Sequence, residues 1–202
     1  MKEEFIKIFQ DNIKREGADR LLKWLESSDF FTAPASSRFH LSEEGGLCRH
    51  SVNVYKRLLN NVHAEFGNDR QKYYSDETLA ICGLLHDICK VNYYKTEYRN
   101  QKDESGAWIK VPFYKVEEKF PFGHGEKSVF LINQFIKLDV TEAIAINWHM
   151  GGFDMRVQGG SQSISEAYDK FDLAIMLHVA DLEATYLDEN PRFQEKKSKE
   201  TK

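Results

Sequence analysis

Several features that assign chains to specialised classes are missing from this sequence. Its three cysteines, Cys48, Cys82 and Cys89, are odd in number and show no CxxC spacing, so we predict reduced, mostly buried thiols rather than disulfides or a thiolate zinc site. No apolar run approaches the roughly 18 residues of a membrane helix, and the acidic N-terminus has no apolar signal core. The net charge of -4 lacks the basic footprint of a dedicated nucleic-acid binder. We therefore expect a cytoplasmic protein with no membrane segment.

Helical periodicity dominates what is present. Apolar residues recur at helical spacing, and glycine, proline or polar residues separate the stretches. The expected helices are two within 4–27, divided near Gly17, then 47–66, 76–87 with Asp76 as its N-cap, 124–136, 141–149, and a last one from 165 or 170 to 187 that Pro191 stops. The pattern predicts an all-α fold with one domain over residues 1–190. The charged residues 191–202 are predicted to be a disordered tail.

The segment 91–122 departs from the helical pattern. It is rich in aromatic and β-branched residues, and the turn-like sequence DESG at 103–106 lies near its centre. This composition predicts a small two-stranded β-hairpin inserted at about residues 92–121. Lysine and arginine alternate with the aromatic residues, but nearby acids almost cancel their charge. Our hypothesis is that the hairpin forms a wall or lid over the functional site, and a structural flap or a dimer contact is the alternative.

Histidines and aspartates stand near the ends of the predicted helices. The candidate ligands are His50, His86, Asp87, His124, His149 and Asp181. Only His86 and Asp87 share a helical turn, so a site built from this set requires several helices that face one centre. Imidazole and carboxylate together suit Zn, Mn, Fe, Co or Ni better than Ca or Mg. The sequence therefore predicts one or two divalent transition-metal ions as cofactor.

These residues lie in motifs that resemble the signature of the HD-domain superfamily of metal-dependent phosphohydrolases. The stretch LLHDICK is similar to the family's HDIGK form, with Cys89 in place of the usual glycine. GGLCRHSVNV resembles the segment of the first ligand, HGEKSV and WHMGG resemble the intermediate histidine motifs of the two-metal branch, and LHVADLEATY resembles the final helix. The resemblance spans about residues 45–187, with five elements in order.

The resemblance implies an HD-domain helical bundle and a role for each matching residue. The implied core metal ligands are His50, His86, Asp87 and Asp181. Asp87 would bridge two ions and have the central catalytic role, while His124 and His149 would complete the shell of the second ion. Lys90 matches the lysine of HDIGK and would act as a catalytic and substrate-binding cation that holds phosphate. A solvated cation at a helix end is the alternative for Lys90.

Four more residues near or outside these motifs have weaker assignments. Arg49 is a candidate substrate-binding residue, although adjacent helix residues point about 100° apart. His178 lies one helical turn before a candidate ligand, which favours a packing or supporting role. His40 and His63 have no visible partner in the sequence, and we expect them to be ordinary surface residues.

Three functions fit these observations. The first is hydrolysis of a phosphomonoester or phosphodiester, in a nucleotide or short oligonucleotide, by a metal-activated water. The second is a di-iron HD-type oxygenase acting on a small polyol or phosphonate-like substrate, because some relatives with this ligand pattern activate dioxygen. The third is a nucleotide-sensing binding module without turnover. The expected partner is a small phosphorylated substrate, above all a nucleotide; we expect no membrane partner and see no strong nucleic-acid footprint, and the sequence leaves the oligomeric state open.

Overall fold

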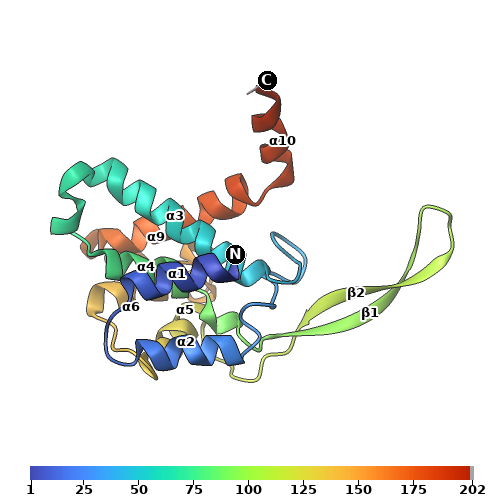
Figure 1. Cartoon of the computed structure of the whole chain (residues 1–202), viewed down its shortest axis with the longest axis horizontal. Coiled ribbons are helices and arrows are strands. Elements are labelled where there is room, and N and C mark those ends of the chain that lie inside the picture. Colours follow the sequence, from blue (N-terminus) through green and yellow to red (C-terminus); the bar gives the residue numbers. More distant parts are fainter. Residues whose placement is uncertain (201–202) are drawn as a thin grey trace.

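A computed structural model describes residues 1–200, and it has an all-α fold with one β-hairpin, as the sequence predicted (Figure 1). The α-helices are α1 (Lys2–Asn12), α2 (Ala18–Ser27), α3 (Gly46–Phe66), α4 (Asp76–Leu85), α5 (His124–Asn133), α6 (Val140–Trp148), α7 (Met155–Gln158), α8 (Ser163–Lys170), α9 (Asp172–Glu183) and α10 (Pro191–Glu200). Shorter helical turns are η1 (Gly67–Lys72), η2 (Ile88–Lys90), η3 (Gly151–Phe153) and the π-turn η4 (Ala184–Asp188). Within residues 1–200, no helix combines the length and apolar character needed to cross a membrane.

Helix α4 is the central element of the bundle. Every residue from Thr78 to Leu85 is buried, and α4 packs against α1, α3 and α6. Ser75, rather than Asp76, is its N-cap, since the Ser75 side chain accepts a hydrogen bond from the Thr78 backbone N–H. A Cβ at Gly83 would overlap the Tyr55 backbone of α3, so this close approach of two helices requires glycine. The tight packing fixes where the C-terminal end of α4 points.

Helix α6 is held at its N-terminus by polar contacts. Asp139 and Glu142 form a capping box, in which each side chain accepts a hydrogen bond from the other residue's backbone N–H. The Arg15 guanidinium, in the loop between α1 and α2, donates two hydrogen bonds of 2.7 Å to the buried Glu142 carboxylate. The first connection of the chain thereby orients α6, which ends directly before a candidate ligand.

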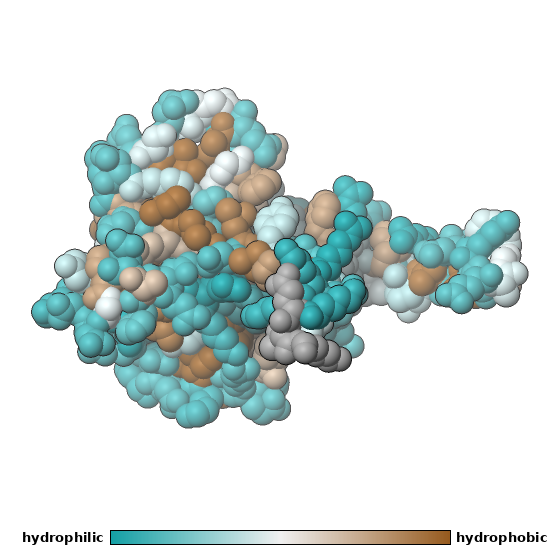
Figure 2. Space-filling view, turned by 90° about the horizontal axis from the view of Figure 1, so that it is seen from above, coloured by the Kyte–Doolittle hydropathy of each residue, from teal (hydrophilic) through white to brown (hydrophobic). Residues whose placement is uncertain are grey.

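The β-hairpin is present as predicted. Strand β1 (Tyr94–Lys102) pairs antiparallel with β2 (Trp108–Val116), and the register runs from Tyr94 opposite Val116 to Lys102 opposite Trp108. Most residues of both strands are exposed, and Trp108 is 69% exposed. The hairpin projects away from the helical body, and its surface is largely hydrophilic (Figures 1 and 2). The hypothesis of a lid is therefore wrong for its outer part, which extends outward instead of folding over the bundle.

The C-terminal segment differs from the prediction of a disordered tail. The helix α10 covers 191–200, and the remaining residues 201–202 lie outside the described part of the chain. Pro191 does not simply stop the preceding helix, because it is the first residue of α10. Proline is favoured there, since the first N–H groups of a helix have no intrahelical acceptor. The side chains of 191–199 are exposed, so their composition correctly indicated that this segment has no core.

Candidate metal centre

The six predicted ligands meet inside the helical bundle. They come from α3 (His50), from the residues directly after α4 (His86 and Asp87), from the start of α5 (His124), from the residue after α6 (His149) and from α9 (Asp181). His50 Nε2 lies 3.1 Å from Asp181 Oδ1 and 3.3 Å from His86 Nε2. His149 Nε2 lies 3.5 Å from Asp87 Oδ1. Helices distant in sequence thus place their imidazoles and carboxylates around one point.

Two histidines have their tautomers fixed by backbone carbonyls. His86 Nδ1 donates to Gly83 O at 3.0 Å, and His149 Nδ1 donates to Ile146 O at 2.6 Å. A carbonyl oxygen only accepts, so Nδ1 carries the proton and the neutral ring presents a lone pair on Nε2. His149 Nε2 is buried without a hydrogen-bond partner in residues 1–200. Metal-binding histidines show this same pairing of one nitrogen with an oxygen acceptor.

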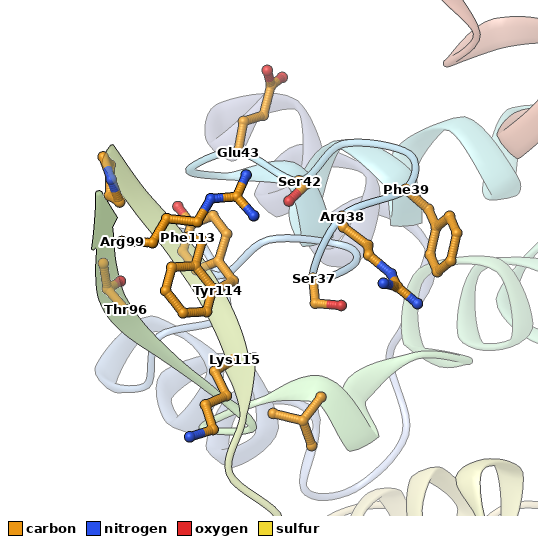
Figure 3. A pocket seen from close by; sticks show the side chains of 12 residues that line it. Ser37, Arg38, Phe39, Ser42, Glu43, Thr96, Arg99, Phe113, Tyr114 and Lys115 are labelled. Atoms are coloured by element: carbon orange, nitrogen blue, oxygen red, sulfur yellow. The ribbon is translucent and has the colours of Figure 1, made fainter. Parts of the chain in front are cut away.

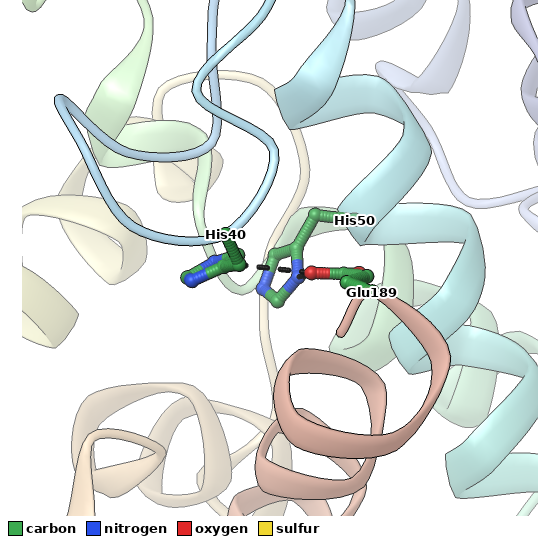
Figure 4. Close-up of side chains that lie close together, drawn as sticks. All are labelled: His40, His50 and Glu189. Atoms are coloured by element: carbon green, nitrogen blue, oxygen red, sulfur yellow. Dashed lines mark hydrogen bonds and ion pairs between the residues drawn. The ribbon is translucent and has the colours of Figure 1, made fainter. Parts of the chain in front are cut away.

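His50 is oriented by a carboxylate that the sequence analysis missed. His50 Nδ1 donates to Glu189 Oε1 at 3.0 Å (Figure 4). Asn53 Nδ2 donates to the same oxygen at 3.0 Å. Glu189 follows the π-turn η4 and is buried. No motif or helical spacing connects it with His50, so only the packing of η4 on α3 reveals the pair.

His40 is not the ordinary surface residue that the sequence suggested. Its ring centroid is 4.9 Å from that of His50, and its Nε2 is 4.0 Å from Glu189 Oε2 (Figure 4). Burial and the neighbouring His50 lower the pKa of His40 to about 4. The loop between α2 and α3 folds onto the edge of the centre, and the sequence contains no signal for this contact.

Asp87 is the residue that most side chains of the cluster approach. Its Oδ1 lies 2.7 Å from His124 Nε2, and its Oδ2 accepts a hydrogen bond of 2.6 Å from Lys90 Nζ. Burial alone would raise the pKa of Asp87, but the Lys90 ammonium and the neighbouring His86 hold it well below its usual range. Lys90 is therefore an internal cation directed at Asp87, and the alternative of a solvated helix-end lysine is wrong.

The carboxylates of the cluster stabilise positive charge on their neighbours. Burial would lower the pKa of His50, but Glu189 and Asp181 raise it to about 10. His86, which has no such carboxylate partner on its other nitrogen, has its pKa lowered to about 3 by burial. A divalent cation satisfies the same carboxylates while using the lone pairs that neutral imidazoles offer. The donor chemistry of the cluster therefore fits a metal ion.

Ligand atoms of this kind form four overlapping groups in residues 1–200, and within each group the atoms lie within 4.8 Å of one another. The groups are His40, His50 and Glu189; His50, His86 and Asp87; His86, His149 and Asp181; and Asp87, Cys89 and His124. His149 thus groups with His86 and Asp181, and it also faces Asp87. Cys89, which was predicted only to be a buried thiol, takes part in the last group.

Other residues singled out in the sequence have different surroundings. Arg49 pairs with Glu43 at the surface, with 2.9 Å between Nη1 and Oε1, and no contact with the six ligands is found in the described residues. His178 Nδ1 donates to His149 O at 2.7 Å, which fits the expected supporting role. Gly151 has a φ of 57°, and a Cβ there would overlap the His178 ring. Glycine at this position, the first residue of η3, therefore lets His178 approach.

A cavity of about 330 Å³ opens beside the centre. Its lining residues are Cys89, Tyr93, Glu118, Phe122, Gly123, His124, Glu126, Lys127, Met150, Phe153, Asp154, Met155 and Arg156. Two cations of this wall are paired: Lys127 Nζ lies 2.8 Å from Glu118, and Arg156 lies 2.7 Å from Glu126. The cavity is thus an aromatic and ionic chamber with direct access to His124.

A larger cavity of about 750 Å³ lies between the loop at 37–43 and the base of the hairpin (Figure 3). Its lining includes the cations Arg38, Arg99 and Lys115 and the rings of Phe113 and Tyr114. None of the six ligands lines it. It is a separate hollow of the surface, and the smaller cavity is the one that reaches the candidate centre.

Comparison of the chain with models of protein families, with curated proteins and with solved structures gives no match. The fold class and the cluster are compatible with the HD-type site that the motifs resemble. What the geometry establishes is a buried histidine and aspartate cluster able to bind metal.

Proposed function

We propose that this protein is an HD-type, metal-dependent phosphohydrolase that cleaves a phosphomonoester or phosphodiester bond in a nucleotide or short oligonucleotide. The observation that carries the proposal is the convergence of four imidazoles on Asp87, beside the Lys90 ammonium and next to a cavity that His124 lines. Nitrogen and carboxylate donors of this kind suit Mn, Fe, Co, Ni or Zn. The motif resemblance in the sequence supports the same reaction class.

The residues divide into two adjoining ligand sets. His50, His86 and Asp181 form one set, and His124 and His149 extend the site on the other side of Asp87, whose two carboxylate oxygens face different groups. Metal ions held there would polarise a phosphoryl oxygen and lower the pKa of a water to supply the nucleophile. Asp87 is positioned to be shared between the two sets.

Lys90 places a positive charge next to Asp87. Its ammonium is 2.6 Å from Asp87 and its side chain is 12% exposed. Once a metal ion neutralises the carboxylate, the ammonium is free to donate to a phosphate oxygen without leaving its place. In this arrangement Lys90 holds the substrate phosphate and offsets the charge that develops on it during attack.

The smaller cavity favours a compact substrate. A volume of about 330 Å³ lies at the lower end of the range of roughly 300–1,000 Å³ for small-molecule sites, which fits one nucleotide unit better than a long polymer. Tyr93, Phe122 and Phe153 line it and offer ring faces for stacking a base. Lys127 and Arg156 line the same cavity, where they pair with Glu118 and Glu126.

The direct test is a hydrolysis assay with added metal. Wild-type protein would be incubated with Mn, Co, Ni or Zn and with nucleoside monophosphates or bis(p-nitrophenyl) phosphate, and released phosphate or nitrophenol would be measured. Asp87→Ala should abolish both metal binding and turnover, because it removes the shared ligand. Asp169→Ala, an exposed acid of α8, is the matched control and should retain both. Full turnover of Asp87→Ala would overturn the proposal.

Lys90 can be separated from the metal ligands in the same assay. Lys90→Ala should keep its metal and lose roughly 10²-fold or more in kcat/KM, as expected for the loss of one charged group that stabilises the transition state. The exposed Lys23→Ala on α2 should change neither quantity. Bound iron with oxygen uptake and no phosphate release would instead favour the oxygenase, and nucleotide binding without turnover would favour the sensing module.

A further inference from the structure

Cys89 lies beside one end of the metal cluster. It follows Asp87 by two residues in the turn η2, and its backbone N–H donates to Ser128 Oγ of α5 at 3.2 Å. This bond joins η2 to the helix whose first residue is His124. As a result, Cys89 Sγ lies 3.4 Å from His124 Nε2 and 3.6 Å from Nδ1. The thiol therefore faces the same imidazole that contacts Asp87.

The spacing of these three side chains fits coordination of one ion. Cys89 Sγ, a ring nitrogen of His124 and a carboxylate oxygen of Asp87 lie within 4.8 Å of one another. In a tetrahedral zinc site, Zn–S and Zn–N bonds of about 2.3 and 2.0 Å place sulfur and nitrogen about 3.5 Å apart. The observed separation of 3.4 Å between Sγ and Nε2 is close to this value. The sulfur is also 3.6 Å from Nδ1, so it lies beside the face of the imidazole, and coordination requires the ring or the thiol to rotate.

An independent observation points to an ion at the same place. His149 is fully buried, and its Nε2 has no hydrogen-bond partner in residues 1–200. This atom lies 3.5 Å from Asp87 Oδ1, the oxygen that also faces His124. A buried lone pair directed at a carboxylate oxygen is unfavourable unless a cation lies between them. The unpartnered nitrogen thus faces the same Asp87 oxygen as His124, the imidazole beside the thiol.

The other two cysteines have different surroundings. Cys48 and Cys82 belong to the hydrophobic core cluster, and neither is in a group of possible ligands within residues 1–200. Cys89 is equally buried but lies outside that core cluster and lines the cavity of about 330 Å³. Its sulfur is therefore the one placed between the bundle centre and the opening for substrate.

We propose that Cys89 is a thiolate ligand of one metal position, together with Asp87 and His124, so that the centre combines a nitrogen- and oxygen-ligated position with one that includes sulfur. The inference rests on the metal centre of the proposed function and specifies its selectivity. Binding breaks the S–H bond, forms a metal–sulfur bond and releases the proton to solvent. Sulfur ligation favours Zn, Co or Fe over Mn, Mg and Ca at this position.

The sulfur-containing position lies next to the space assigned to substrate, because Cys89 and His124 both line the smaller cavity. A metal ion there would be the one nearest the substrate.

The test is a titration of the metal-free protein with Co(II), followed by absorption in the near ultraviolet, where thiolate-to-cobalt charge transfer appears. Wild-type protein and the matched control Cys48→Ala should both show the band. Cys89→Ala should lack it and bind the second equivalent of Co(II) at least tenfold more weakly. Circular dichroism would verify that each variant is folded, and the wild-type spectrum tests sulfur ligation without any substitution.

The outcomes separate this inference from the proposed function. Two Co(II) ions bound by wild-type protein without a charge-transfer band, or an unchanged band in Cys89→Ala, would contradict the thiolate ligand and leave the phosphohydrolase proposal intact. A chain that binds no Co(II) at all would contradict both. A band that disappears in Cys89→Ala, with about one equivalent of Co(II) retained, would establish the mixed centre.

Discussion

The bundle centre and the β-hairpin represent opposite extremes in this molecule. At the centre, ionisable side chains from α3, α5, α9 and the residues after α4 and α6 are buried or half-buried, and hydrogen bonds to Gly83 O, Ile146 O and the Glu189 carboxylate orient three of the imidazoles. Along the outer hairpin, large apolar side chains such as Tyr98 and Trp108 are 67% and 69% exposed. The centre therefore has its polar groups where burial is costly, and the hairpin has aromatic groups where burial is absent.

This contrast distinguishes the candidate functional site at the bundle centre from the exposed β-hairpin. Burying charged groups is unfavourable unless each has a partner, so a buried cluster whose lone pairs converge indicates a ligand. An exposed two-stranded ribbon gains little stability from its own contacts. We therefore expect changes at the centre to alter stability and metal binding strongly, and changes at the outer hairpin to alter neither.

The largest expected effect is that of removing the metal. A metal ion whose free concentration is about 1,000 times its dissociation constant adds about 4 kcal/mol to the free energy of unfolding. For a domain of this size, that corresponds to a fall in melting temperature of roughly 10 °C when a chelator is added. Thermal denaturation by circular dichroism, with and without chelator, measures it. An unchanged melting temperature would mean that no metal stabilises the centre, which would then be an ordinary buried polar cluster.

The next effect concerns the ion pair that orients α6. Glu142→Ala removes a fully buried carboxylate and leaves Arg15 without its partner, which should lower the free energy of unfolding by about 2–3 kcal/mol. Glu166→Ala breaks an exposed pair with Lys170 and should cost less than about 0.5 kcal/mol. Denaturant titration of both variants measures the difference. Equal losses would show that burial of Glu142 contributes nothing.

A smaller effect is expected at the carboxylate behind His50. Glu189→Gln keeps the size of the side chain but removes the charge that orients His50 Nδ1. Loss of such a partner typically weakens metal affinity by about 10–100-fold. Competition with a calibrated chelator measures this affinity, and the exposed Glu195→Gln of α10 is the matched control. Equal affinities in the two variants would mean that Glu189 only fills space.

The smallest effect is expected in the hairpin. Trp108→Ala removes a large, exposed ring that lies next to the Lys102 ammonium. The free energy of unfolding should change by less than about 0.5 kcal/mol, since the ring buries little area. Metal content should be unchanged as well. A loss of several kcal/mol would show that the outer hairpin packs on something and would erase the contrast between the two regions.

The fold could be predicted from the sequence where local rules decide it. Helical spacing and the glycines gave the helices and the break at Gly17, and aromatic composition around DESG gave the hairpin. The direction of the hairpin could not be predicted, because composition does not determine the angle at which two strands leave a bundle. The helix after Pro191 was missed because a charged segment without a core resembles disorder by composition.

The candidate site could be predicted only where local sequence motifs mark its residues. Motifs that stand in order along the chain indicated the six ligands, and the structure brings them together. Glu189 and His40 were missed because they reach His50 from segments without any motif or spacing. Arg49 lies beside a candidate ligand in sequence, yet its side chain pairs with Glu43 at the surface, because adjacent helix residues point about 100° apart. Contacts between distant segments require the packed structure.

The central claim is that the histidine and aspartate cluster is a metal centre, and the most direct test is metal content. Protein purified without chelator and without a histidine tag would be analysed by elemental mass spectrometry, beside Asp87→Ala. The two adjoining ligand sets predict about two transition-metal ions per chain in the wild type, since a carboxylate can be shared between two ions, and few or none in the variant. A wild-type chain that stays free of metal, even after reconstitution, would contradict the account.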